Sequence, residues 1–196
     1  MKRFFICIFA ICAIGASANA QSWLNALKKV ATDAVDNITG GKLTEVAIVG
    51  SWSYSAPALR LGSDDNALAA LGGQAISSTV GQKLAPILEG IGVKEGFCTI
   101  TFNSDGTFAL PIKGRTISGK YTFDSATHAI KLTIGKLGTE INGFAYISGE
   151  SLQLMFNVDK FKDLIISLGS NIDALPSITS IIEQYDDINL GLEFKR

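Results

Sequence analysis

The sequence predicts a mainly β protein: an antiparallel up-and-down barrel of about eight strands, with helices before the first strand, after the first strand and before the last strand. In residues 97–158 apolar and polar side chains alternate with a period of two, which is the pattern of strands with one buried face. The connections between these strands are too short to hold a helix, so neighbouring strands run antiparallel. Residues 46–55 and 188–195 supply the two further strands that close the sheet edges into a barrel.

The central strands are separated by polar and glycine-rich turns. Gly106, at the end of Asn103-Ser104-Asp105-Gly106, can adopt the positive φ that closes a short hairpin. Residues 124–127 form the next polar turn, and Gly135 and Gly138 delimit the connection after it. The apolar side chains between these turns therefore share one face of the sheet, and closure of the barrel directs that face inward.

The inward face carries the candidate binding residues. Pockets for apolar ligands are lined by large apolar side chains with a few polar groups such as tyrosine hydroxyls. The residues that we expect to contact a ligand inside the barrel are Trp52, Tyr54, Phe102, Phe108, Tyr121, Phe123, Leu132, Leu154 and Phe156. The same side chains can instead fill a small barrel completely, and composition does not separate a filled interior from an open one.

The N-terminus reads as a secretory signal peptide over residues 1–20. Lys2 and Arg3 precede an apolar run over residues 4–15, and Ala18-Asn19-Ala20 fits the cleavage site. This run is too short to cross a bilayer, so we expect no membrane span. Removing 20 of the 196 residues leaves 176, enough for one domain with a sizeable core. We expect a protein exported from a bacterial cell, periplasmic or secreted.

Charge and cysteine content exclude several classes of protein. Loss of the leader changes the net charge from −1 to −3 and leaves no basic patch, which argues against binding to nucleic acid. Cys98 is then the one remaining cysteine, so no intramolecular disulfide can form. It falls on the apolar face of its strand, and we expect a small buried hydrophobic side chain rather than a nucleophile.

Motifs for catalysis are absent from the sequence. His128 is the single histidine, and its position in a hairpin turn predicts a solvated surface group. Without a second histidine or a cysteine cluster we expect no transition-metal site and no cofactor. Asp64-Asp65 and Asp186-Asp187 could bind calcium, but adjacent carboxylates at a helix end more often cap the helix. We therefore expect a protein that is not an enzyme.

An amphipathic helix is expected in residues 21–45, ahead of the barrel domain at 46–196. Ser22 fits its N-cap, and Gly40-Gly41 ends it. Its apolar face, which we expect to pack on the domain, carries Trp23, Leu27, Val30, Ala31, Ala34 and Ile38. Its two lysines give too little positive charge to hold a membrane surface.

Helices are also expected in the insertion at residues 63–91. Ser63-Asp64-Asp65 caps a short helix, Gly72-Gly73 breaks it, and a second apolar stripe follows, with a kink at Pro86. Before the last strand, Asp159 fits the cap of one helix and Pro176 fits the first turn of another. The apolar stripes of these helices predict packing against the barrel.

The start of the first strand resembles that of lipocalins and lipocalin-like proteins. Gly50-x-Trp52 is similar to their G-x-W motif, and its place at the head of an eight-stranded meander strengthens the resemblance. The resemblance implies that Trp52 closes the base of the barrel and packs against a basic side chain at the end of the last strand. Arg196 is the expected partner, because a guanidinium group can stack on an indole.

The chain also resembles uncharacterised families of small exported bacterial lipocalin-like proteins, a likeness that implies no activity. It departs from lipocalins in the length of the segment between Tyr54 and Phe97, where lipocalins have a loop over the barrel mouth. The insertion can therefore act as a lid over a cavity or as a plug that fills it.

Two functions follow from these alternatives. The first is a monomeric exported carrier of a small apolar ligand, with no catalysis. The second is a filled barrel that binds another exported protein or an envelope surface and takes no small ligand. An enzyme is a distant third, since it would need a polar pair inside the barrel that the sequence does not reveal.

Overall fold

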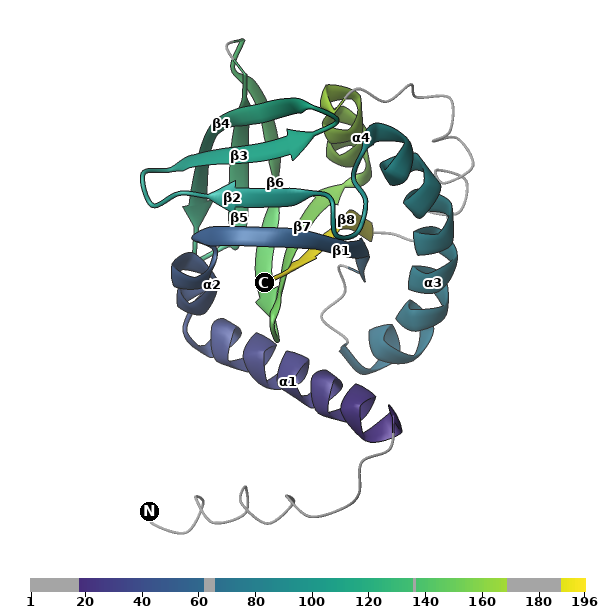
Figure 1. The fold of residues 1–196 in the computed structure, drawn as a ribbon. Helices are drawn as coiled ribbons and strands as arrows, with labels where there is room; N and C mark the ends of the chain where they lie inside the picture. The colour runs from purple at the N-terminus through teal and green to yellow at the C-terminus, as the bar shows by residue number, and fades with distance from the viewer. Residues whose placement is uncertain (1–17, 62–65, 136, 169–187) are drawn as a thin grey trace.

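A computed structural model describes residues 18–61, 66–135, 137–168 and 188–196, with side chains at residues 28–60, 79–135, 137–168 and 188–196. Eight strands form a closed barrel in which each strand pairs with the next and β1 pairs with β8 (Figure 1). The strands are β1 (Gly50–Leu61), β2 (Thr99–Phe102), β3 (Thr107–Ile112), β4 (Arg115–Asp124), β5 (Ala129–Ile134), β6 (Thr139–Ser148), β7 (Ser151–Asn157) and β8 (Ile188–Lys195). The predicted fold class is confirmed.

The long first strand closes the barrel. Its beginning pairs with β2, where Gly50 lies opposite Phe102, and its remainder pairs with β8, from Ser53 opposite Lys195 onward. A bulge between Tyr54 and Ala56 shifts the register within this second pairing, and bulges bend and twist a strand. One strand can therefore belong to both walls of the barrel, which leaves no open edge.

The core lies inside the barrel because each strand buries alternate side chains. In β3, for example, Phe108, Leu110 and Ile112 are all buried, whereas the residues between them are half-buried or exposed. The same alternation is the period-two pattern of the sequence, so the observed register follows from which face is apolar. The interior forms one apolar cluster with the inward faces of two helices.

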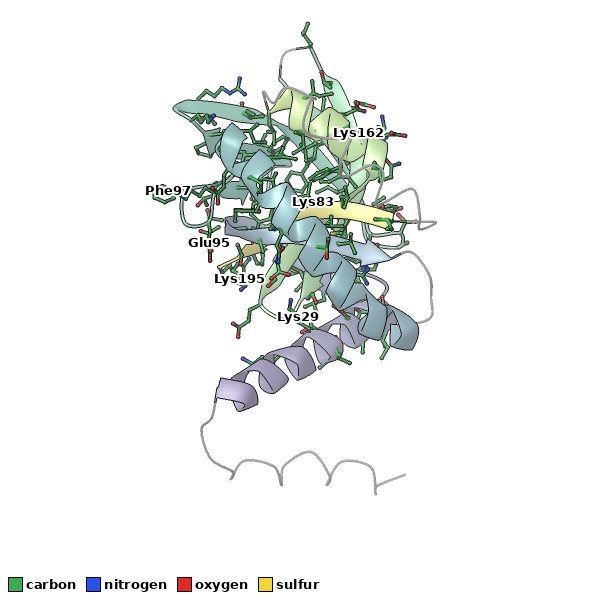
Figure 2. All side chains as sticks on the ribbon, turned by 90° about the vertical axis from the view of Figure 1, so that its right-hand side faces the viewer. Lys29, Lys83, Glu95, Phe97, Lys162 and Lys195 are labelled. Atoms are coloured by element: carbon green, nitrogen blue, oxygen red, sulfur yellow. The ribbon has the colours of Figure 1, made fainter. Side chains whose placement is uncertain are left out.

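Helix α3 (Asn66–Ile91) packs along β1 and contributes the buried side chains of Val80, Leu84 and Leu88 to this cluster. Figure 2 shows it crossing one side of the barrel, with Lys83 on its outward side. The predicted break at Gly72-Gly73 is wrong, because α3 is continuous through both glycines. A helical glycine costs only about 1 kcal/mol relative to alanine, which burial of the apolar stripe outweighs. The predicted cap at residues 63–65 lies outside the described residues.

Helix α4 (Val158–Ser167) follows β7 directly and covers the barrel with Phe161, Leu164 and Ile165. Its N-cap is Asn157 rather than the predicted Asp159: the Asn157 side chain accepts a hydrogen bond from the backbone N–H of Lys160 at 2.8 Å. The predicted helix after Pro176 lies outside the described part of the chain. No helix in that part is both long enough and apolar enough to cross a membrane.

Helices α1 (Ala18–Ile38) and α2 (Lys42–Ala47) lie against the barrel near β6 (Figure 1). The predicted orientation of the first helix is wrong: Val30 is 67% exposed, Ile38 is 86% exposed, and Ala31 and Ala34 also face solvent. The side chains of Trp23 and Leu27 lie outside the description. The opposite, polar face of α1 contacts the barrel, because Lys29 and Asp36 on this face pair with Glu193 and His128.

Candidate functional site

The base of the barrel is closed by Trp52 and Arg196. The guanidinium carbon of Arg196 lies 4.3 Å from the centre of the Trp52 ring, within the range of a cation–π contact. Arg196 Nη2 also donates hydrogen bonds of 2.8 Å to the carbonyl oxygens of Ala47 and Val49. The indole Nε1 of Trp52 donates to the carbonyl of Ile48 at 2.8 Å. The structure thus places Trp52 and Arg196 together, as the lipocalin resemblance implied. Their contacts hold the start of β1 and the end of the chain together, which is a structural role.

The predicted ligand-binding residues all belong to or border the core. Seven are buried and form part of the interior cluster: Trp52, Tyr54, Phe102, Phe108, Leu132, Leu154 and Phe156. Tyr121 and Phe123 are partly buried and pack against that cluster. Tyr121 also reaches outward, since its hydroxyl donates to the carbonyl of Asn103 at 3.0 Å. The nine residues therefore share one core but do not all meet at one site.

Four of the nine line an apolar cavity inside the barrel, next to α4. This cavity has a volume of about 20 Å³ and an entirely apolar lining, roughly enough for one water molecule. Its walls are Ile100, Phe108, Leu110, Ile117, Leu132, Ile134, Leu154, Phe156, Leu164, Leu168, Leu192 and Phe194. Leu164 and Leu168 belong to α4 and its C-terminal end, so this helix covers the cavity.

Glycines on the strands let the aromatic side chains fill the rest of this region. A Cβ placed on Gly143 would lie 2.5 Å from Cδ1 of Phe156, and one placed on Gly119 would lie 3.0 Å from Cε1 of Phe108. Both distances are shorter than a real carbon–carbon contact. The phenylalanine rings therefore lie over bare backbone and fill this part of the barrel interior.

Burial also sets the chemistry of the polar groups in the core. Cys98 is 1% exposed, and burial raises the pKa of its thiol to about 11. Burial likewise raises the pKa of the Tyr54 hydroxyl. Both groups stay protonated at neutral pH, and Cys98 lacks the thiolate character of a nucleophile.

A polar cluster that the sequence did not reveal links α1 and α2 to the barrel. The Asp36 carboxylate is buried and accepts hydrogen bonds from the backbone N–H and the hydroxyl of Thr44. Its Oδ2 also lies 2.9 Å from Nε2 of His128. The Thr44 hydroxyl in turn accepts a hydrogen bond of 3.0 Å from the N–H of Ile147 on β6. The cluster therefore joins α1 and α2, which are adjacent in sequence, to a turn and a strand of the barrel about 90 to 100 residues away.

The expectation that His128 is a solvated surface group is wrong. Its side chain is 12% exposed and its ring stacks on that of Tyr146, with centres 4.9 Å apart. His128 does lie in the predicted hairpin turn, but α1 lies over this turn and Asp36 of α1 contacts the imidazole ring. Nothing in the local sequence pairs two residues that are 92 positions apart.

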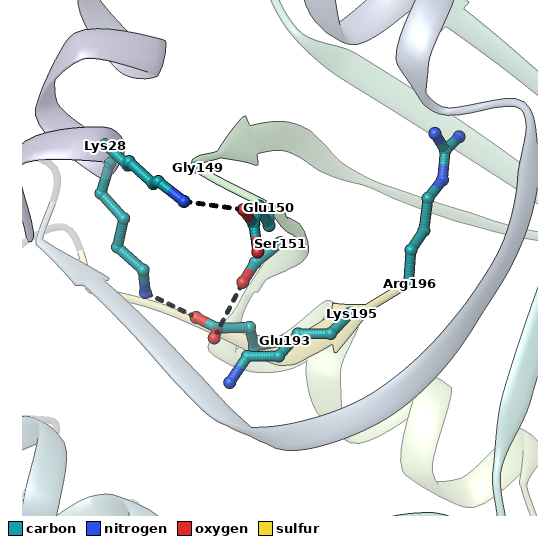
Figure 3. A pocket seen from close by; sticks show the side chains of 8 residues that line it. Lys28, Gly149, Glu150, Ser151, Glu193, Lys195 and Arg196 are labelled. Atoms are coloured by element: carbon teal, nitrogen blue, oxygen red, sulfur yellow. Dashed lines mark hydrogen bonds and ion pairs between the residues drawn. The ribbon is translucent and has the colours of Figure 1, made fainter. Parts of the chain in front are cut away.

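A second, polar pocket lies between α1, the β6–β7 turn and β8, with a volume of about 310 Å³. Figure 3 shows Lys28, Glu150, Ser151, Glu193 and Lys195 around it. Lys28 pairs with Glu150 at 3.0 Å. The sequence alone does not indicate this pocket, because its walls come from three segments with no common motif.

Glu193 is the most tightly held group of this pocket. Its carboxylate accepts hydrogen bonds from Lys29 at 3.2 Å, Ser151 at 3.2 Å and Gln153 at 3.1 Å. Burial alone would raise the pKa of this carboxyl, but the ammonium group of Lys29 and the hydrogen bonds from Gln153 and Ser151 outweigh burial and lower it. Glu193 is therefore ionised at neutral pH.

In the described part of the chain, no three His, Cys, Asp or Glu side chains gather closely enough to hold a metal ion. Asp64-Asp65 and Asp186-Asp187, the calcium candidates of the sequence, lie outside the described ranges. The described residues thus form a small apolar cavity inside the barrel, a polar pocket beside α1 and a third, open hollow along β2 to β5.

Comparison with known proteins bears on the fold. A family model described as "Lipocalin-like domain (DUF4923)" matches residues 24–196. Among solved structures, a DUF4847 family protein from Bacteroides vulgatus ATCC 8482 is similar, with 17% identity and a TM-score of 0.38. That alignment covers 78% of this chain and 96% of the other. A comparison with curated proteins gave no match.

Proposed function

The chain belongs to the lipocalin-like DUF4923 family, and we propose that its barrel binds a small apolar molecule, without catalysis, after export from the cell. The observation that carries this proposal is the entirely apolar cavity between the strands and α4. Phe108, Leu132, Leu154 and Phe156 are part of its barrel wall, and strand alternation predicts that these four residues contact a ligand. The export step rests on the signal peptide that the sequence predicts at residues 1–20.

Binding requires α4 to move, because small-molecule pockets usually span about 300–1,000 Å³ and this cavity has about 20 Å³. Among the described residues, Arg115 holds the end of α4 by donating a hydrogen bond to the carbonyl of Leu168. Buried apolar side chains such as Phe161 and Ile165 also hold the helix on the barrel, and an apolar ligand can replace contacts of this kind. We infer that α4 is the lid of the site.

The test combines native mass spectrometry with an uncharged fluorescent probe, N-phenyl-1-naphthylamine. Mature protein exposed to extract of its own environment should carry a discrete added mass that is lost on denaturation. The probe should bind the wild type, and Leu164→Phe, which fills the cavity, should weaken that binding. Ile166→Phe is the matched control, because Ile166 is 43% exposed on the outer side of the same helix. Equal probe binding by both variants would contradict the proposal, provided that circular dichroism shows both to be folded.

A second candidate is a filled barrel that binds another exported protein or an envelope surface. It is favoured by the exposed apolar side chains of α1 and α2, since Val30, Ile38 and Val46 are 67%, 86% and 78% exposed. Neighbouring exposed apolar groups often mark an interaction surface. Absence of an added mass and of probe binding would favour this candidate. Ile38→Lys would then be expected to weaken binding to the partner and leave the fold intact.

A further inference from the structure

The polar pocket outside the barrel has the form of a second binding site. Its lining consists of Lys28 and Lys29 from α1, Gly149 and Glu150 of the β6–β7 turn with Ser151 at the start of β7, and Glu193 and Lys195 from β8 with Arg196 after it. Arg196 is already engaged by Trp52 and by the carbonyls of Ala47 and Val49. Its volume of about 310 Å³ is at the lower end of the range for small-molecule pockets. Figure 2 shows Lys29 and Lys195 near each other, at the side of the barrel that α1 approaches.

The turn of this pocket is shaped to receive α1. Gly149 has a φ of 65°, and a Cβ placed on it would lie 3.3 Å from Cγ of Lys29. A side chain at this position would be strained by its backbone and would press on α1. The glycine thus brings the turn and the helix close enough to share one concave surface.

The charges of the pocket leave a surplus of positive charge. Glu193 accepts hydrogen bonds from three donors and neutralises Lys29. Lys195 lies two residues further along the same face of β8, and its ammonium group has no ion-pair partner among the residues with described side chains. The pair of Lys28 with Glu150 is solvent-exposed, with 48% and 81% of the two side chains accessible. Such a pair contributes little and can open for a ligand.

We propose that this pocket binds a small organic acid that carries hydroxyl groups, with its carboxylate between Lys195 and Lys28. A carboxylate is the complement of two ammonium groups, and charge-assisted hydrogen bonds are stronger than neutral ones. When Lys28 turns to the ligand, the Glu150 carboxylate is released to accept hydrogen bonds from ligand hydroxyl groups. Glu193 stays bound to its three donors and keeps Lys29 in place.

Such a ligand also ties α1 to the barrel. The described contacts of α1 with the strands include the pairs Lys28–Glu150, Lys29–Glu193 and Asp36–His128, while its apolar face is exposed. An anion held by Lys28 and Lys195 adds a link between the helix and β8. Binding to one conformation stabilises that conformation, so occupancy slows the opening of α1.

The test is a calorimetric titration of the mature protein with D-glucuronate at constant ionic strength. D-glucose, which lacks the carboxylate, is the uncharged control ligand. Glucuronate should bind saturably and glucose should not. Lys195→Met should weaken the affinity about tenfold, the loss that corresponds to one charge-assisted contact of about 1.4 kcal/mol. Lys131→Met is the control, because Lys131 is an exposed lysine on β5 that pairs with Glu140 away from the pocket.

Hydrogen exchange gives a second readout, in which glucuronate should slow exchange of the α1 amides at residues 28–38 in the wild type but not in Lys195→Met. Equal binding of glucose, equal affinity of the Lys195→Met and Lys131→Met variants, or no saturable binding at millimolar glucuronate would each overturn the proposal. None of these outcomes bears on the apolar cavity, whose probe and variants are different.

Discussion

Gly50 and Arg196 occupy one small space at the base of the barrel. A Cβ at position 50 would lie 3.1 Å from Nη2 of Arg196, and Gly50 has a φ of 131°, which side chains rarely adopt. The first residue of the G-x-W motif therefore leaves room for the guanidinium group that covers its third residue, Trp52. The motif and the C-terminal arginine form one unit.

Gly50→Ala should lower the free energy of unfolding by about 2 kcal/mol, because it combines backbone strain with displacement of Arg196. Chemical denaturation measures this loss. Gly90→Ala is the matched control: Gly90 lies in α3 and a Cβ there meets nothing within 4 Å, so this change should preserve or raise stability. Equal stability of the Gly50→Ala variant and the wild type would contradict the account of the motif.

Arg196→Ala should cost about 2 kcal/mol of stability, because it removes the cation–π contact with Trp52 and two hydrogen bonds to the carbonyls of Ala47 and Val49. Arg196→Lys should recover only part of this loss, since an ammonium group lacks the planar, multidentate geometry of guanidinium. Urea denaturation of both variants is the measurement. Full recovery by lysine would show that charge alone matters at this position.

Asp36 should make stability depend on acid pH. Burial alone would raise its pKa, but hydrogen bonds from Thr44 and the interaction with His128 outweigh burial and hold the pKa below the ordinary 3.8. A carboxyl whose pKa is lower in the folded state stabilises the fold above the unfolded pKa, and this contribution is lost as the pH falls through the folded pKa. The loss is therefore expected below about pH 4.

The measurement is urea denaturation of the wild type and Asp36→Asn between pH 3 and pH 7. At neutral pH the variant should be less stable by about 2 kcal/mol, the cost of losing charged hydrogen bonds in a buried site, and the gap should narrow below pH 4. Asp33 is a useful contrast, because burial raises its pKa. Ionisation of Asp33 therefore lowers the stability of the fold as the pH rises, whereas ionisation of Asp36 raises it. Parallel stability curves for wild type and Asp36→Asn would contradict the role of Asp36.

Phe156→Ala should enlarge the apolar cavity and lower stability by about 3–5 kcal/mol. Phe156 is fully buried, lies over Gly143 and lines the cavity below α4. The variant should bind N-phenyl-1-naphthylamine more tightly than the wild type does, provided that it stays folded. Phe156→Leu is the milder version, and Phe144→Ala, at a half-buried outward position on β6, is the control. Unchanged probe affinity in both Phe156 variants would show that the probe binds elsewhere.

The barrel was predictable because the alternation of apolar and polar residues shows which face of each strand is buried. Phe108, Leu110 and Ile112 alternate with less buried residues, and a one-residue shift would expose all three. The G-x-W motif predicts that Trp52 lies at the base of the barrel. Arg196 is the predicted partner because it follows the last strand. These features are local or depend on strand ends, so sequence alone can locate them.

The pockets and the docking of α1 were not predictable in the same way. The periodicity of α1 separates two faces, but which face meets the barrel depends on partners such as Glu193 and His128, which lie far along the chain. The volume of the interior depends on how Phe156 lies over Gly143, a matter of rotamer and backbone proximity. Strand alternation shows that a side chain points inward, but it does not show how much room remains beside it.

The seam between β1 and β8 has a consequence for how the chain reaches its native state. Ser53 pairs with Lys195, so almost the whole barrel lies between the two partners in sequence, and contacts of such separation form slowly. The meander from β2 to β7 can assemble early from neighbouring hairpins, but its β2 edge stays unpaired until β1 docks and its β7 edge until β8 arrives. During that interval the intermediate is exposed to edge-to-edge association with other copies, and the last strand decides when this exposure ends.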